Sequence, residues 1–235
     1  MRRSSVPAIT QWLLAVVVLV ATLPATALAH GVTSGDKGYL QEVSGVLLIP
    51  FTYLGAKHMV TGYDHLAFLV GVIFFLYRVK DVVLYVSLFT LGHSLTLLGG
   101  VLGGIEANPY LVDAVIGLSV VYKALDNLAV FPRVFGFQPD ARAAVLLFGL
   151  CHGFGLATKL QAFALPANGL VANIVSFNVG VELGQFVALT SVLALLTIWR
   201  ARPGYLRHAF LTNTALLGAG FLLFGYQLSG YALGS

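Results

Sequence analysis

Residues 82–103 read VVLYVSLFTLGHSLTLLGGVLG, a stretch of 22 residues without a single Asp, Glu, Lys or Arg. A helix of about 20 mainly apolar residues is long enough to cross the hydrocarbon core of a bilayer. The whole chain of 235 residues is 58% hydrophobic and only 9% charged, whereas soluble domains carry about 25% charged residues. This composition excludes a water-soluble globular protein and a disordered chain, and it indicates an all-α polytopic membrane protein.

Five further apolar stretches have lengths suited to membrane spans. The predicted spans are 62–78, 82–103, 110–130, 142–163, 170–199 and 207–232. The stretch 43–56 is shorter and contains Pro50, so we interpret it as an interfacial or re-entrant helix. The sequence therefore predicts six transmembrane helices plus this short helix, in a single transmembrane domain over residues 43–235.

The N-terminus has the parts of a secretory signal peptide. A basic start precedes an apolar run, which ends in the small-x-small motif Ala-Leu-Ala at 27–29. We predict a cleaved signal peptide over 1–29 and a short outer segment over 30–42. Cleavage would place His30 at the new terminus, where an imidazole beside an amine could chelate a metal, or where the histidine is incidental.

The distribution of basic residues predicts the orientation. If the mature N-terminus lies outside, the cytoplasmic loops hold seven Lys and Arg residues and the outer segments hold three, which obeys the positive-inside bias. If 43–56 also crossed the membrane, every later loop would change sides and the bias would reverse. We therefore expect a multi-pass protein of the inner membrane with both mature termini on the outer, periplasmic side.

Several partners and cofactors are excluded by the same composition. The net charge of +4 is small and scattered, which argues against a nucleic-acid surface. The chain has no Walker A string and therefore no recognisable nucleotide site. Cys151 is the only cysteine, so neither an intrachain disulfide nor a cysteine-based zinc cage can form. The expected partners are the lipid bilayer and a small ion, and a homo-oligomer is left open.

Polar side chains inside spans are costly, and they mark function by default. They gather in five strings: HMVTGYDH (58–65), FTLGHSLTL (89–97), LSVVYKALDN (118–127), FGLCHGFG (148–155) and FNVGVELGQ (177–185). Imidazoles with carboxylates suit nickel, cobalt, zinc or copper, or a proton relay, whereas magnesium and calcium prefer oxygen ligands. Structural roles are the alternatives: Asp64 as a helix cap, and Lys123 with Asp126 as an internal ion pair.

In this order, the five strings resemble successive sequence blocks of the second subgroup of the HupE/UreJ family, and His58-x5-Asp64-His65 resembles its HX5DH motif. The resemblance covers about residues 55–190. It implies a small membrane permease for nickel or cobalt, and it assigns metal-binding candidates to His58, Asp64, His65, His93, His152 and Glu182. We add six supporting polar residues: Ser94, Lys123, Asp126, Asn127, Asn178 and Gln185.

One block differs from the nickel-permease branch of the family. In that branch, a second His and a Glu closely follow a His-Gly pair, whereas Phe154-Gly155-Leu156 follow His152-Gly153 here. Zinc and copper therefore stay open beside nickel and cobalt as the transported ion.

The leading hypothesis is a permease for a divalent transition metal, with no catalytic residues and no tightly bound cofactor. Protons would compete with metal for the imidazoles, so we expect uptake to weaken at acid pH. One alternative is a membrane-embedded zinc-dependent hydrolase, although the sequence has neither HExxH nor GxSxG. The other is a non-transporting accessory protein for metalloenzyme maturation.

Overall fold

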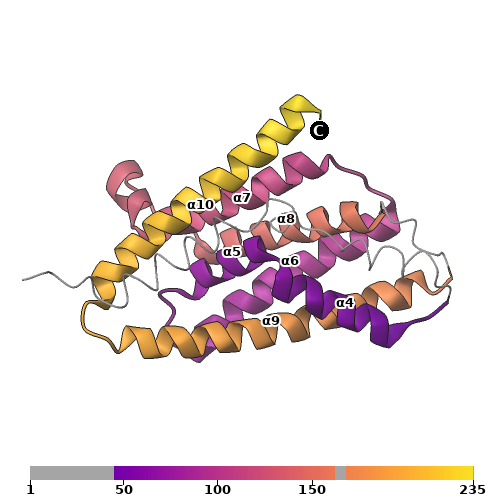
Figure 1. Ribbon diagram of the computed structural model, residues 1–235, viewed down its shortest axis with the longest axis horizontal. Coiled ribbons are helices and arrows are strands. Elements are labelled where there is room, and N and C mark those ends of the chain that lie inside the picture. Colours follow the sequence, from indigo (N-terminus) through magenta and orange to yellow (C-terminus); the bar gives the residue numbers. More distant parts are fainter. Residues whose placement is uncertain (1–44, 162–167, 235) are drawn as a thin grey trace, which may run out of the picture. The chain divides into compact units, whose positions relative to one another are not determined.

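The computed structural model describes residues 45–161 and 168–234, and all regular structure in these ranges is helical. The predicted signal peptide (1–29) and outer segment (30–42) lie outside the described residues. The helices labelled in Figure 1 and the short π-helix η1 are α4 (Leu48–Thr61), α5 (Tyr63–Ile73), α6 (Val79–Gly103), α7 (Pro109–Asn127), η1 (Phe131–Phe135), α8 (Ala141–Gln161), α9 (Leu170–Arg200) and α10 (Tyr205–Leu233).

Within the described residues, four helices are long and apolar enough to cross a membrane: α6, α8, α9 and α10. They coincide with four of the predicted spans. Helix α7 follows the predicted span 110–130 and has 19 residues, but it carries Asp113, Lys123 and Asp126. The structure thus supports a multi-pass membrane protein.

The prediction is wrong at the first span. In place of one helix over 62–78, the chain forms α5, whose 11 residues are too few to cross a bilayer alone. The helix expected at 43–56 is displaced to α4, and only Gly62 separates it from α5. Pro50 lies in the first turn of α4, where its missing N–H breaks no helical hydrogen bond. The two predicted elements are therefore two consecutive short helices.

Helix α5 ends where a distant arginine takes up its last carbonyl groups. Arg200, at the end of α9, donates from Nη2 to the carbonyl oxygens of Ile73 (2.7 Å) and Phe74 (2.6 Å). Its Nη1 donates to Leu76 O at 2.9 Å. The helical donors that these carbonyls would use in a longer helix are missing, and a cation at a helix C-terminus is favourable. Ile73 O also accepts from Leu76 N at 3.0 Å, and Phe74 O from the Tyr205 hydroxyl at 3.2 Å. Arg200 therefore fixes where α5 stops.

Replacing Arg200 with glutamine is expected to destabilise the fold. The change removes charge-assisted hydrogen bonds to three carbonyl groups, at a cost of about 2–4 kcal/mol. The measurement is thermal unfolding of the purified protein in detergent. Arg202→Gln is the matched control, because Arg202 is exposed two residues further on. Equal unfolding temperatures for the two variants would contradict this role of Arg200.

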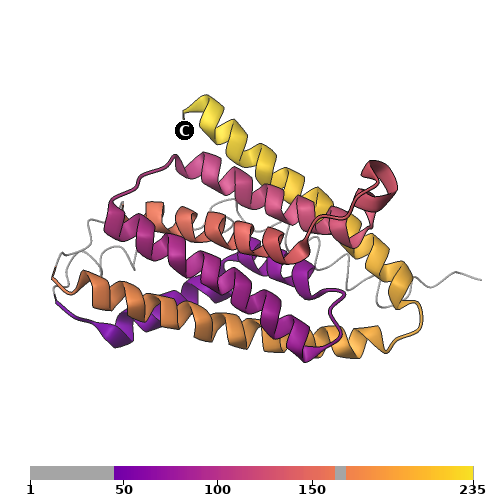
Figure 2. The ribbon, with the colours of Figure 1, turned by 180° about the vertical axis from the view of Figure 1, so that it is seen from behind.

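The helices pack in three close pairs: α4 with α9, α6 with α8, and α7 with α10. Figures 1 and 2 show each pair side by side from opposite directions. Glycines line all three contacts. A Cβ at Gly180 of α9 would overlap the carbonyl oxygen of Thr52, and one at Gly184 would lie 2.6 Å from that of Ala56. The GxxxG spacing of these two glycines thus serves close helix packing.

The start of α4 is anchored to α9 by one amide side chain. Asn173 accepts a hydrogen bond from Leu47 N at 2.7 Å and donates to Gly45 O at 2.9 Å. It thereby satisfies an N–H group at the start of α4 that no helical carbonyl can reach. Because this bond and the glycine contacts fix α4 against α9, the last turn of α4 is held in the interior.

Candidate metal-binding site

The junction of α4 and α5 brings three predicted site residues together. His58 lies in the last turn of α4, and Asp64 and His65 lie in the first turn of α5. All three are buried. A Cβ at Gly62 would lie 3.0 Å from the His58 carbonyl oxygen and 3.2 Å from Nδ1 of His65. A larger residue at position 62 would crowd both atoms and push them apart by a few tenths of an ångström.

The contact between α6 and α8 supplies two more histidines. His93 and His152 are each 0% exposed. Gly92 of α6 lies against the α8 backbone, and Gly149 of α8 lies against Phe89 of α6. The backbones can approach so closely only because these positions lack side chains, and both imidazoles are thus held in the interior.

Four histidines from four helices form one buried group, which we call the histidine cluster: His58, His65, His93 and His152. The ring centroid of His65 lies 5.3 Å from that of His58 and 5.7 Å from that of His93. It lies 4.5 Å from that of His152. His65 is therefore in ring contact with all three other members.

Two neighbouring polar groups orient the rings of the histidine cluster. Asp64 Oδ1 accepts a hydrogen bond from the backbone N–H of His65 at 2.8 Å and lies 3.2 Å from its Nδ1. Ser119 Oγ donates to the carbonyl oxygen of Ile116 at 2.6 Å and lies 3.2 Å from Nε2 of His152. Because the hydroxyl proton is committed to Ile116, Nε2 of His152 is the donor to Ser119. Nδ1 of His152 then keeps its lone pair.

Some cluster nitrogens have no hydrogen-bond partner among the described residues. These are both ring nitrogens of His93 and Nδ1 of His152. Buried polar atoms without partners are uncommon and call for a ligand, water or ion. In the described ranges, no three His, Cys, Asp or Glu side chains are arranged to hold a metal. The rings of His58, His93 and His152 instead meet His65 at 68–85°.

Three of the supporting polar residues tie α6 to α9 rather than joining the histidine cluster. Ser94 Oγ donates to Asn178 Oδ1 at 3.1 Å. Gln185 Nε2 donates to Thr90 Oγ1 at 2.8 Å. These hydrogen bonds fix the α6–α9 contact beside His93, so the three residues act in positioning.

The other supporting residues lie near the C-terminal end of α7. Lys123 forms an ion pair with Asp126, which also accepts a hydrogen bond from Gln138 at 2.6 Å. Asn127 donates to Gly71 O at 2.9 Å and to Asn213 Oδ1 at 2.8 Å. The pair matches the structural alternative raised for it, and Asn127 joins α7 to α5 and α10.

Glu182 is not brought to the histidine cluster. Its neighbours Asn178 and Gln185 are buried, but Glu182 is exposed on α9, as are Leu183 and Phe186. The buried face of α9 is turned toward α4 and α6, and Glu182 falls beyond its edge. Its assignment as a metal ligand stays a prediction from the sequence.

The sequence analysis missed a second buried charged pair. Lys159 Nζ lies 3.0 and 2.7 Å from the two carboxylate oxygens of Asp113, across the α7–α8 contact. A signal was present, because Lys159 follows His152 by seven residues and therefore lies on the same face of α8. In the distribution of basic residues, Lys159 is one of the three in the outer segments.

Comparison with known proteins identifies the family of this helical bundle with its four buried histidines. The family described as HupE / UreJ protein matches residues 34–235. The chain therefore belongs to the HupE/UreJ family, as the sequence blocks predicted. Membership associates it with metal transport or with an accessory role. No curated protein and no solved structure shows significant similarity to it.

Proposed function

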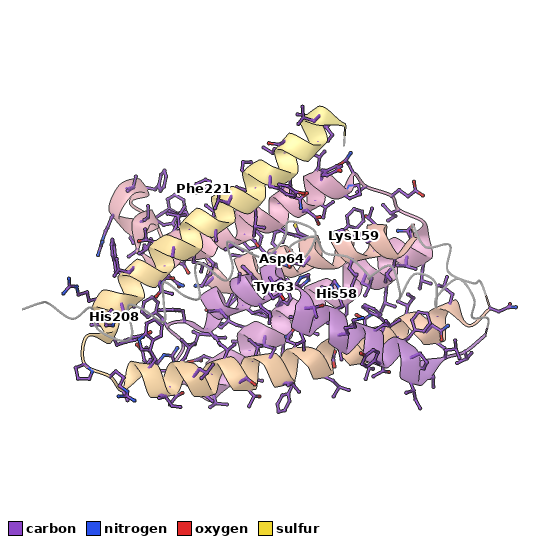
Figure 3. All side chains as sticks on the ribbon, in the orientation of Figure 1. His58, Tyr63, Asp64, Lys159, His208 and Phe221 are labelled. Atoms are coloured by element: carbon purple, nitrogen blue, oxygen red, sulfur yellow. The ribbon has the colours of Figure 1, made fainter. Side chains whose placement is uncertain are left out.

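We propose that this protein is a membrane permease for a divalent transition-metal ion, nickel or cobalt in the first place, and that the histidine cluster is its ion-binding site. The observation that carries the proposal is the meeting of four buried histidines from α4, α5, α6 and α8. In Figure 3, His58 and Asp64 lie near the centre of the group of helices, where α4 meets α5, whereas His208 lies near the start of α10.

The spacing of the histidine rings supports a shared ion. Two imidazoles bound to one metal through nitrogens at about 2.1 Å have ring centroids about 4.5–5.5 Å apart. The contacts of His65 span 4.5–5.7 Å. Rotation of the rings about their Cβ–Cγ bonds would turn nitrogens toward a common centre. Nitrogen ligands favour nickel, cobalt, copper and zinc over magnesium and calcium.

The packing supports a six-crossing topology with a broken first span. Helices α4 and α5 together contain as many residues as a full span, with the cluster at their junction. The contacts Asn173–Leu47 and Gly184–Ala56 show that α4 and α9 run in the same direction. Six crossings then keep the basic loops on the cytoplasmic side. Substrate sites at the ends of discontinuous helices are a recurrent solution in transporters.

A flux assay tests the proposal. We expect proteoliposomes that contain the full chain to accumulate radioactive nickel or cobalt well above protein-free vesicles, because the cluster supplies an ion site within the bilayer. Zinc and copper are measured in parallel to determine the selectivity. Absence of flux for all four metals, with metal-dependent defects still present in cells that lack the protein, would favour the accessory role. Hydrolysis of a lipid or amide by zinc-loaded protein would favour the hydrolase.

A further inference from the structure

A buried ion pair lies outside the histidine cluster and is left unused by the proposed site. The side chains of Asp113 and Lys159 are only 8% and 15% exposed. Both carboxylate oxygens of Asp113 accept hydrogen bonds from Lys159 Nζ. Gln227 of α10 adds a third contact, with its Nε2 at 3.4 Å from Asp113 Oδ2. The pair thus joins α7, α8 and α10.

The pair lies on α7 and α8, the two helices that carry Ser119 and His152. Asp113 Oδ1 lies 3.7 Å from the position that a Cβ of Gly155 would take, three residues beyond His152 on α8. Along α8, Lys159 is seven residues beyond His152, or about 10 Å. In the proposed topology this is the outer side, so the ion pair stands between the cluster and the outer face.

Asp113 largely neutralises the charge of Lys159 while the two side chains are paired. When the pair opens, the ammonium group repels a divalent cation nearby and the carboxylate attracts it, and both effects are strong in a low-dielectric interior. A buried ion pair is also seldom better for stability than apolar packing of the same volume. Stability alone therefore does not account for a buried ion pair at this place.

We propose that the Asp113–Lys159 pair controls access of the divalent ion from the outer side to the histidine cluster. Lys159 occupies the carboxylate of Asp113 while the cluster is empty. Asp113 receives the arriving cation when the lysine side chain turns away, and the displaced ammonium group then favours passage of the ion inward. This inference rests on the proposed function.

The test is metal binding by single-charge variants of the full chain, purified in detergent and titrated with Co²⁺ by calorimetry and visible absorption. Asp113→Asn leaves an unpaired ammonium group beside the site, so its Kd is expected to rise about tenfold or more. Lys159→Met leaves an unpaired carboxylate, so its Kd is expected to fall about tenfold. The double variant restores neutrality and is expected within about threefold of the wild type.

Opposite changes in the Kd for Co²⁺, a rise for Asp113→Asn and a fall for Lys159→Met, separate this role from a structural one. Glu106→Gln and Lys80→Met are the matched controls, because both residues are exposed. If both pair variants bind Co²⁺ more weakly and unfold at lower temperature without metal, the pair is only a helix lock and the proposal is overturned. Values of Kd equal to those of the controls would also overturn it. If the wild type binds neither Co²⁺ nor Ni²⁺, the proposed function itself fails together with this inference.

Discussion

Replacing His65 with alanine is expected to abolish metal binding and reduce cellular uptake of ⁶³Ni or ⁵⁷Co to background. His65 is the one cluster member in ring contact with the other three, so its loss removes a ligand and separates the rest. Loss of groups that merely orient a ligand lowers metal affinity about 10–100-fold. Loss of the central ligand should exceed this range.

The matched control for this experiment is His208→Ala. His208 lies on α10, outside the cluster and only half-buried. It is expected to support wild-type uptake, which shows that removing a histidine is not harmful in itself. Both variants are compared at equal membrane abundance and with helix content checked by circular dichroism. Equal uptake by wild type and His65→Ala would eliminate the role assigned to His65.

The membrane helices could be predicted because their signal is local. A long apolar run without charges has no other stable state in a bilayer, and α8 and α9 begin and end within about two residues of the predicted spans. The first span failed for a non-local reason. Residues 66–77 contain no charged side chain, but the end of α5 is set by Arg200, more than 120 residues away.

The histidines of the cluster could be named from the sequence, but their meeting could not be derived from it. His93 and His152 come together because glycines let α6 and α8 touch, and the sequence does not show which glycine meets which helix. Gly180 packs against α4, whereas Gly99, which has the same GxxxG spacing, has nothing within 4 Å of a Cβ. Spacing identifies a helix face without identifying its partner.

Because spacing does not identify the partner of a helix face, the positions of several polar and charged residues also could not be predicted. Asn178, Glu182 and Gln185 share a face by their spacing, but only the contacts of α9 show that Glu182 falls on the exposed side. Asp113 and Lys159 lie 46 positions apart, near opposite ends of their helices in chain order. Packing of α7 against α8 makes them a pair, and no local pattern contains that contact.

Replacing Gly153 with alanine is expected to destabilise the protein strongly. A Cβ there would overlap the backbone carbonyl of His93, and it would lie 2.4 Å from Thr96 Oγ1. Backbone atoms cannot turn aside as a flexible side chain can, so α6 and α8 must separate. Thr96 then loses its 2.7 Å hydrogen bond to Leu150 O. The expected loss in unfolding free energy is about 3 kcal/mol or more.

Gly99→Ala is the matched control for Gly153→Ala, because nothing lies within 4 Å of a Cβ at Gly99. Alanine is the better helix former by about 1 kcal/mol, so this control should be neutral or slightly stabilising in thermal unfolding. Gly153→Ala should also weaken Co²⁺ binding, because separating α6 from α8 moves His93 away from His152. If Gly153→Ala keeps both wild-type stability and wild-type metal affinity, the close α6–α8 contact is not what assembles the histidine cluster.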